Sequence, residues 1–316
     1  MNARTLPAAF GGPGWSSRTR PMHEEIGELW ADFSVDSEVG RLRAVLLHRP
    51  GPELDRAAGD DAALMLSPAD TDAARRQHDL LAAAYDEEGV EVHRVDPPVE
   101  PPPNQMFCAD TFFMTPEGAI LARPASTIRA GEERWIARRL AELGVPIVRS
   151  ISGTGTFEGA DAQWLDPGTV LLSRGLRTNA EGVRQVREVL EGIGVRVIVV
   201  DLPYGAMHLM GQIRFLDRDL AIVRQGRLAL SAVEAMREMG YTVLTFPDDA
   251  EIDNHYGHNF VTLGPRRVLM PAGNRKTRRL LEEHGVEGRS VEIAELAKAA
   301  GGIGCLTGIL RRDPVA

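Results

Sequence analysis

A repeat with a spacing of 48 to 51 residues limits the possible folds of this chain more than any other feature. Four segments each contain a short apolar stretch, a turn with Pro, Gly or Asp, and a second apolar stretch. This pattern predicts a β-hairpin in each segment. The segments are DTFFMTPEGAILAR (110–123), DAQWLDPGTVLLSR (161–174), GQIRFLDRDLAIVR (211–224) and NFVTLGPRRVLMPA (259–272).

The same two elements follow each hairpin. The first is a helical pattern with apolar residues at i, i+3 and i+4 and a closing glycine, and the second is a short β-branched run. The repeating unit is therefore strand, strand, helix, strand. The helical segments lie at 131–144, 179–194, 228–240 and 276–285, and the final strands at 145–150, 195–200, 241–246 and 286–293.

The two ends of the sequence supply a fifth unit. The segment CLTGILRR (305–312) provides one strand of a hairpin and GRLRAVLLHRP (40–50) the other, followed by a helix over 70–89 and a strand over 90–96. A repeat that cannot bury its face alone stacks on its neighbours, so pairing of the two ends closes the stack into a ring. We therefore predict an α/β fold, a five-bladed α/β propeller with pseudo-fivefold symmetry. The alternative is a two-domain α/β chain with coincidental spacing.

Equivalent positions in a ring of repeats converge near its axis. Asp110 begins the first hairpin, Glu158 and His208 each precede a hairpin by three residues, and Cys305 begins the fifth. The intervals between them are 48, 50 and 97 residues, and the last interval spans two units. These four side chains are therefore expected to meet in one pocket.

The four residues form a coherent set for covalent catalysis. A cysteine attacks as the thiolate, and nearby cations or backbone N–H groups lower its pKa. Gly301, Gly302 and Gly304 permit the unusual backbone conformations that expose such N–H groups. His208 can exchange protons at neutral pH, one carboxylate can orient its ring, and the other can bind a planar cation such as guanidinium.

Five motifs together resemble the guanidino-group modifying enzymes, a superfamily that includes arginine deiminases, dimethylarginine dimethylaminohydrolases and amidinotransferases. The resemblance extends over residues 38 to 314 and implies a five-bladed α/β propeller of the pentein type, acting without a metal or organic cofactor. It also implies that Cys305 attacks the guanidinium carbon to form a covalent thiouronium intermediate. In that scheme His208 protonates the leaving amine and then activates water. The motifs are PNQMFCAD (103–110), GTFEGAD (155–161), SRGLRTN (173–179), MHLMGQ (207–212) and GGIGCLTGILRRDP (301–314).

The resemblance also implies roles by position. Asp110 matches the guanidinium-binding carboxylate, and Glu158 matches the carboxylate that partners His208. The polar segment 51–70 resembles the lid that closes over a substrate. The residues expected to bind substrate or line its pocket are Arg177, Arg123, Asn104, Phe107 and Asp161, with Asp60 and Asp61 of the lid as further candidates.

Three departures from the family pattern leave the substrate open. Arginine deiminases have Asp where this chain has Met210, which favours an alkylated or otherwise modified guanidine. Many deiminases have Arg where Ala109 stands, and amidinotransferases usually have His where Gly304 stands. The predicted activity is hydrolysis of a C–N bond of arginine or an N-substituted arginine. The alternatives are an amidinotransferase and a catalytically inactive propeller that acts as a binding module.

Composition narrows the setting of this activity. No apolar run approaches the roughly 20 residues that cross a bilayer, and a net charge of −9 argues against binding nucleic acid through its phosphates. With two cysteines and no continuous apolar segment at its start, the chain is expected to be cytoplasmic, with free thiols. We expect residues 1–30 to form a flexible N-terminal tail and residues 31–316 a single catalytic domain. The expected partner is a small guanidino compound, without nucleic acid or membrane, and a homodimer is left open.

Several other residues receive structural interpretations. Cys108 lies in an apolar run and is expected in the core. The arginines at 123, 174 and 224 recur at one repeat offset, which favours structural salt bridges for some of them. The motif DNHYGH, with Asp253, His255 and His258, lacks the further ligand cluster of a zinc site. GTGTFEG (153–159) lacks the helix and glycine spacing of a dinucleotide loop, so we predict neither a metal nor a nucleotide cofactor.

Overall fold

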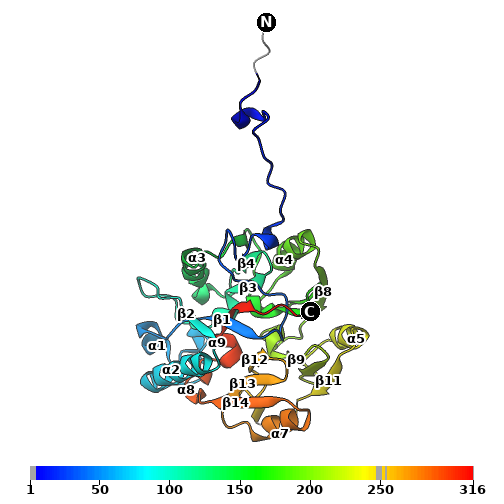
Figure 1. The fold of residues 1–316 in the computed structure, drawn as a ribbon. Coiled ribbons are helices and arrows are strands. Elements are labelled where there is room, and N and C mark those ends of the chain that lie inside the picture. The colour runs from blue at the N-terminus through cyan, green and yellow to red at the C-terminus, as the bar shows by residue number, and fades with distance from the viewer. Residues whose placement is uncertain (1–4, 247–250, 253–254, 316) are drawn as a thin grey trace.

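The computed structural model describes residues 5–246, 251–252 and 255–315, and this part of the chain contains five three-stranded sheets (Figure 1). In each sheet the first strand is antiparallel to the second, and the third lies parallel on the other side of the second. One shared topology in five sheets fits the five units that the repeat predicts. The sheets are β3 (Phe112–Thr115), β4 (Gly118–Leu121) and β5 (Ile147–Ser150); β6 (Ala162–Asp166), β7 (Thr169–Arg174) and β8 (Arg196–Asp201); β9 (Ile213–Asp217), β10 (Leu220–Val223) and β11 (Thr242–Thr245); β12 (Val261–Gly264), β13 (Arg267–Pro271) and β14 (Glu287–Val291); and β15 (Gly308–Arg312), β1 (Leu42–Leu47) and β2 (Glu91–Arg94).

A helix connects the second strand of each sheet to the third. Parallel neighbours need such a crossover, because a tight turn can join only antiparallel strands. Figure 1 shows these helices around the outside of the molecule, with the sheets toward its centre. They are α2 (Thr71–Glu87), α3 (Glu132–Glu142), α4 (Ala180–Gly192), α5 (Leu230–Glu238) and α7 (Arg275–Glu283).

Helix α4 illustrates how the local sequence produces the unit. Asn179 caps its N-terminus by accepting a hydrogen bond of 2.8 Å from Gly182 N. Val183, Val186 and Leu190 lie on one helix face and are buried in the core shared with β7. Burying a side chain of this size stabilises the fold by roughly 1.5–3 kcal/mol.

The fifth sheet joins segments from opposite ends of the sequence. Strand β1 is its middle strand, antiparallel to β15 with Val45 opposite Ile309, and parallel to β2. This confirms the predicted pairing of the two ends. One detail was wrong: Cys305 is not part of the strand. It lies in the one-turn helix α9 (Ile303–Leu306), and β15 begins only at Gly308 because the glycine-rich segment 301–304 first turns the chain inward.

The N-terminal segment differs from the rest of the chain in its packing. Figure 1 shows the described residues from 5 onward extending away from the sheets before the chain reaches them. Two short 3₁₀ turns lie in it, η1 (Ala8–Phe10) and η2 (Met22–Glu24), and neither contains a buried residue. Over the described residues, none of the helices combines the length and the apolar character needed to span a bilayer.

Candidate active site

The candidate site is built from the segments that precede the first strand of each sheet. Asp110 ends the 3₁₀ turn η4 (Cys108–Asp110) before β3, Glu158 caps η6 (Gly159–Asp161) before β6, and His208 caps η7 (Leu209–Gly211) before β9. Asn259 precedes β12, and Cys305 lies in α9 before β15. All five side chains are buried. The structure therefore brings together the four predicted residues and adds a fifth.

Asn259 was missed by the sequence analysis, although the repeat contained a signal for it. The interval of 97 residues between His208 and Cys305 spans two units, so one unit had no assigned side chain. Asn259 occupies that unit's position. The side chains compared between units were titratable ones, and the Asn259 amide is not titratable.

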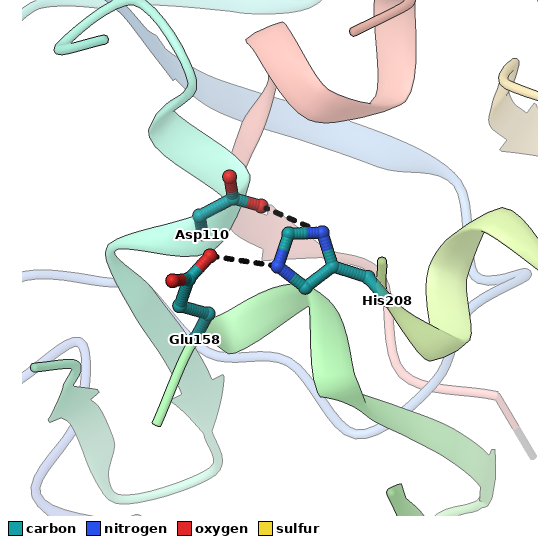
Figure 2. Close-up of side chains that lie close together, drawn as sticks. All are labelled: Asp110, Glu158 and His208. Carbon is teal, nitrogen blue, oxygen red and sulfur yellow. Dashed lines mark hydrogen bonds and ion pairs between the residues drawn. The ribbon is translucent and has the colours of Figure 1, made fainter. Parts of the chain in front are cut away.

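The His208 ring lies between two carboxylates (Figure 2). Its Nε2 is 2.7 Å from Glu158 Oε2, and its Nδ1 is 3.8 Å from Asp110 Oδ1. Asp110 Oδ1 is buried without a hydrogen-bond partner among the described residues. A buried acceptor of this kind costs free energy unless a donor reaches it, so it is suited to a ligand N–H group.

The charges around His208 favour its protonated form. Burial alone would lower the pKa of His208, but Asp110 and the Glu158 carboxylate outweigh it and raise the pKa to about 9. Burial likewise opposes ionisation of Glu158, but Arg129, His208 and Arg177 together hold the pKa of Glu158 well below its usual range. At neutral pH the pair is therefore an imidazolium and a carboxylate.

Two buried arginines complete this cluster. Arg129 Nη1 donates to Asp110 Oδ2 at 2.8 Å and to Glu158 Oε2 at 3.0 Å, while its Nε and Nη2 bind Glu132. Arg177 Nη1 lies 3.3 Å from Glu158 Oε1. Arg177 was predicted as a site residue, and Arg129 was not.

Arg129 had a weaker signal in the sequence. It follows Asp110 by 19 residues, as Arg177 follows Glu158, but Asp110 begins its hairpin whereas Glu158 precedes its hairpin by three residues. The two arginines are therefore not equivalent positions of the repeat. Arg123 was predicted from the family resemblance, which did not point to Arg129.

Arg123 lies apart from the cluster. It is exposed, its Nη1 donates to the Gly155 carbonyl oxygen at 2.9 Å, and its backbone forms a bridge with Phe157. These contacts join two neighbouring units and direct the guanidinium away from Glu158. The structure therefore gives Arg123 a structural position and places Arg129 in the cluster.

Asp161 is close to the site but faces the protein interior. Its carboxylate accepts hydrogen bonds from Ser173 Oγ at 2.7 Å, Thr178 Oγ1 at 2.6 Å and Leu209 N at 3.0 Å. It does not line the cavities next to Cys305. Through its hydrogen bond with Leu209 N it fixes the backbone beside His208.

Cys305 is buried and has a polar partner at its sulfur. Asn259 Nδ2 donates to Sγ at 3.0 Å, and Asn259 Oδ1 accepts from the Cys305 backbone N–H at 3.3 Å. Burial and the Asp110 charge raise the pKa of Cys305, while the Gly302 backbone, Asn259 and Arg214 act to lower it. The second cysteine, Cys108, is buried in the apolar core as predicted.

Two cavities meet at Cys305. The smaller, of about 20 Å³, contains the predicted pocket residues Asn104 and Phe107 together with Asp110, Arg129 and Arg177. The larger, of about 180 Å³, is lined by His208, Met210 and Asn259. A group lying between the two cavities would face the sulfur, the imidazolium and the unpaired carboxylate oxygen at once.

The predicted lid covers the smaller cavity. Segment 51–70 contains α1 (Pro52–Ala57) and the 3₁₀ turn η3 (Asp61–Ala63), and its Leu64 lines that cavity. Asn104 Nδ2 donates to the Ala63 carbonyl oxygen at 2.9 Å, which ties the lid to the pocket wall. Asp60 instead caps η3 by accepting from Ala62 N.

A metal ion fits these residues poorly. Asp110, Glu158 and His208 form the only group of possible ligands in the described part of the chain, with ligand atoms within 4.8 Å of one another. The same carboxylates already bind the Arg129 guanidinium, and a protonated imidazole offers no lone pair to a metal. Of the other candidates, Asp253 lies outside the described residues, and His258 Nδ1 lies 3.0 Å from the Ile252 carbonyl oxygen.

Comparisons with known proteins identify the family of the chain. A family model described as arginine deiminase matches residues 96–242. An N(G),N(G)-dimethylarginine dimethylaminohydrolase from Streptomyces coelicolor is 30% identical over 269 residues, which cover 85% of this chain and 97% of that protein. The chain belongs to the guanidino-group modifying enzyme superfamily. The family resemblance predicted from the five motifs is thereby confirmed.

Other members of the guanidino-group modifying enzyme superfamily match over much of the chain. The N(G),N(G)-dimethylarginine dimethylaminohydrolase of Pseudomonas aeruginosa is 28% identical over 211 residues, 67% of this chain and 78% of that protein. A solved structure of the P. aeruginosa enzyme in complex with citrulline has a TM-score of 0.72 at 24% identity, covering 84% of this chain and 98% of that one. The fold described above is therefore that of the superfamily.

Proposed function

We propose that this protein hydrolyses a C–N bond of a guanidino compound, an N-substituted arginine in preference to arginine, through a covalent intermediate on Cys305. The main support is the unpaired Asp110 Oδ1, which lies beside the protonated His208 and lines a cavity together with Cys305. A guanidinium carbon above Sγ could donate N–H groups to that oxygen. Names of the relatives that match the chain support the same reaction class.

In this proposal the site binds the two charged ends of the substrate with groups of opposite charge. Asp110 accepts hydrogen bonds from the N–H groups of the substrate guanidinium. The planar arrangement of those N–H groups matches the two oxygens of a carboxylate. Arg177, which contacts Glu158 through Nη1, holds the α-carboxylate of the amino acid. Met210 lies in the cavity on the other side of Cys305, where an apolar side chain suits an alkyl substituent on the departing nitrogen.

The reaction then proceeds in two balanced halves. The Cys305 thiolate attacks the guanidinium carbon, the bond to the leaving nitrogen breaks, and His208 gives that nitrogen its proton, which leaves an S-alkylthiouronium and a neutral imidazole. His208 next removes a proton from water as the water attacks the same carbon. The carbon–sulfur bond breaks, the remaining hydroxyl proton passes to solvent, and the neutral ureido product and the thiolate are released. Glu158 keeps the ring in place throughout.

The proposal extends to the architecture. We infer that the five sheets are the blades of a pseudo-fivefold α/β propeller and that residues 31–316 form its single catalytic domain. The shared topology of the sheets and the pairing of β1 with β15 support this. In such a ring the segments before each first strand lie around the axis, where the candidate site is found.

Trapping and product analysis test the proposed reaction. A slowly turned-over amidine or guanidine should give an adduct on the peptide with Cys305, and Cys305→Ser should remove both the adduct and the activity. Arginine and its N-methylated forms should then be compared for release of ammonia, alkylamine, urea and citrulline. Alkylamine and citrulline are the expected products. An adduct elsewhere, or full activity of Cys305→Ser, contradicts the mechanism.

The same assays separate the alternatives. Capture of the amidino group by an added amine would indicate an amidinotransferase. Release of more than one equivalent of ammonia from arginine would indicate sequential hydrolysis to ornithine. An unreactive Cys305 with tight ligand binding would indicate a binding module.

A further inference from the structure

Arg214 lies behind Cys305 and has no role in the scheme above. It projects from the first strand of the third sheet, β9, and only 7% of its surface is exposed. Its Nε donates to the His258 carbonyl oxygen at 3.3 Å and its Nη2 to Asn259 Oδ1 at 3.3 Å. Within the described part of the chain, no carboxylate lies at salt-bridge distance from it. A buried guanidinium held only by neutral acceptors is costly, so its retention calls for a reason.

The Asn259 amide connects this guanidinium to the sulfur. Its Oδ1 accepts from both Arg214 Nη2 and the Cys305 backbone N–H, and its Nδ2 donates to Cys305 Sγ. Because two donors meet Oδ1, the flipped amide would place its NH2 group against them. The unflipped orientation is therefore fixed, and in it the Nδ2–H group points at Sγ. Arg214 therefore orients the hydrogen-bond donor that Cys305 uses.

Gly304 makes room for the same guanidinium. A Cβ at this position would overlap Arg214 Nη2 and would lie 2.6 Å from Asn259 Oδ1. The backbone at Gly304 is not in the left-handed region, so space and not conformation requires glycine there. Any side chain before the nucleophile, including the histidine expected of an amidinotransferase, would have to displace Arg214.

We propose that Arg214 is a positioning residue for the nucleophile: it occupies the space of a side chain at position 304, orients Asn259 toward Sγ, and stabilises the Cys305 thiolate with a permanent positive charge. This rests on the proposed function of Cys305. The electrostatics agree, since burial lowers the pKa of Arg214 only to about 10, which leaves it charged at neutral pH, and the Cys305 thiolate stabilises that charge in return. The Cys305 thiolate is thus the main stabilising charge for Arg214, with a further contribution from Glu38.

The test is the pH dependence of Cys305 alkylation in the substrate-free enzyme. Iodoacetamide labelling of the Cys305 peptide, followed by mass spectrometry, gives the apparent pKa of that thiol without interference from Cys108. The charged or titratable groups that face the sulfur or line its two cavities are Asp110, Arg129, Arg177, His208, Arg214, Arg224, Arg227, Tyr256 and His258. Glu38, Tyr85 and Arg312 also act on the Arg214 charge. Each variant below changes at most one of these groups.

Removing the charge should raise the thiol pKa. For Arg214→Met we expect an increase of about 1 unit and labelling at pH 7 that is about tenfold slower. Arg214→Lys should restore most of the rate, because it keeps the charge, but turnover should stay below wild type because one ammonium cannot replace the guanidinium fork. Arg312→Met is the matched control: Arg312 is also buried, but it donates to the Gly40 and Thr262 carbonyl oxygens and not to Asn259. A wild-type labelling profile in Arg214→Met overturns the proposal.

A second pair of variants tests the steric link at Gly304, and its single variant Gly304→Ser, which keeps Arg214, also serves where Arg214→Met fails to fold. Gly304→Ser alone should reduce labelling and turnover by about tenfold or more, because the new side chain displaces the guanidinium. In an Arg214→Ala background the same change should have little further effect. Equal losses from Gly304→Ser in both backgrounds would overturn the steric link. If Cys305→Ser stays active while these labelling results hold, the proposed reaction is wrong. The positioning of the thiol by Arg214 would still stand.

Discussion

Cys305 lies between two buried regions that use charge in opposite ways. On one side, carboxylates and cations alternate in direct contact, with Arg129 and Arg177 on Glu158 and His208 between Glu158 and Asp110. On the other side, the Arg214 guanidinium lies among an amide, a carbonyl oxygen and the neutral ring of His258, where burial lowers the pKa of that histidine to about 3. With Glu132, which binds the other side of Arg129, the first region has as many carboxylates as cations and is balanced within itself. In the second region no carboxylate of the described residues contacts Arg214 directly, and the Cys305 thiolate stabilises its charge more than Glu38 does.

This difference separates two tasks that many active sites combine. The balanced region can accept a charged substrate and move a proton, because each of its groups has a partner to exchange. The unbalanced region has nothing to exchange, so its fixed charge can act only on the nucleophile. Each of the following predictions concerns a change that disrupts one of the two regions.

The largest effect is expected from breaking the balanced region at Glu158. Glu158→Gln removes the carboxylate that Arg129, Arg177 and His208 all contact. We expect turnover to fall by about 10³-fold and the free energy of unfolding to fall by roughly 3–5 kcal/mol, because a buried charge network loses its centre. Steady-state kinetics and urea unfolding measure the two. The exposed Glu188→Gln, which loses a surface ion pair with Arg184, should change stability by less than about 0.5 kcal/mol. Near-normal turnover in Glu158→Gln would show that His208 needs no carboxylate partner.

Raising the pH should reversibly remove the positive charge of His208 from the same region. The folded-state pKa of His208 is about 9, above its ordinary 6.5, so its contribution to stability is complete below about pH 6.5 and is lost as the pH rises through 9. The loss should be on the order of 3 kcal/mol. Urea unfolding of wild type and His208→Gln at pH 6 and pH 9.5 measures it. The difference between the two proteins should shrink at the higher pH, with His284→Gln as the control for losing a histidine. A constant difference would contradict a protonated His208.

The predictability of the two regions from sequence also differs, for physical reasons. Asp110, Glu158, His208 and Cys305 were found because titratable side chains recur where the repeat converges, and those side chains are costly to bury without a purpose. Hairpins, helices and the pairing of the two ends followed from the same repeat. Asn259 obeys the repeat too, but its amide is not a titratable group. Arg129 keeps the distance of Arg177 from its carboxylate without sharing its place in the unit.

Arg214 had no signal of its own. It lies inside a hairpin strand, where an arginine is ordinary on a solvent face, and only the packing of β9 against α9 turns it inward. Gly304 was noted as a departure from a family pattern, but its meaning required knowing which side chain fills the space. Neighbours from different sheets are beyond what one sequence can indicate.

One substitution can give the unbalanced region a carboxylate in contact with its cation, as in the balanced region. Asn259→Asp places a carboxylate between Arg214 and Sγ, where it satisfies the guanidinium and repels the thiolate. Labelling of Cys305 at pH 7 should slow by about tenfold. Asn179→Asp, at the N-cap of α4, controls for the chemistry of the substitution and should leave labelling unchanged. Faster labelling of Asn259→Asp would mean that the amide, and not the charge behind it, restrains the thiol.

The smallest effect is expected from removing metal ions. Arg129 already fills the cation position between Asp110 and Glu158, so dialysis against EDTA should change turnover by less than about twofold. Activity before and after dialysis, with added Zn²⁺ as a second arm, measures this. Loss of activity that Zn²⁺ restores would show that the balanced region holds a metal.

The pairing of β15 with β1 has a consequence for the newly made protein. During translation, Asp110, Glu158, His208 and Arg214 leave the ribosome well before the nucleophile, and β1 has no partner on one edge until residues 308–312 follow. An unpaired edge of this kind readily joins a strand of another chain, so the incomplete protein is a target for chaperones and for aggregation. Closing the last sheet seals that edge and delivers the reactive sulfur in one event. On the proposed mechanism, a half-made copy is therefore inactive.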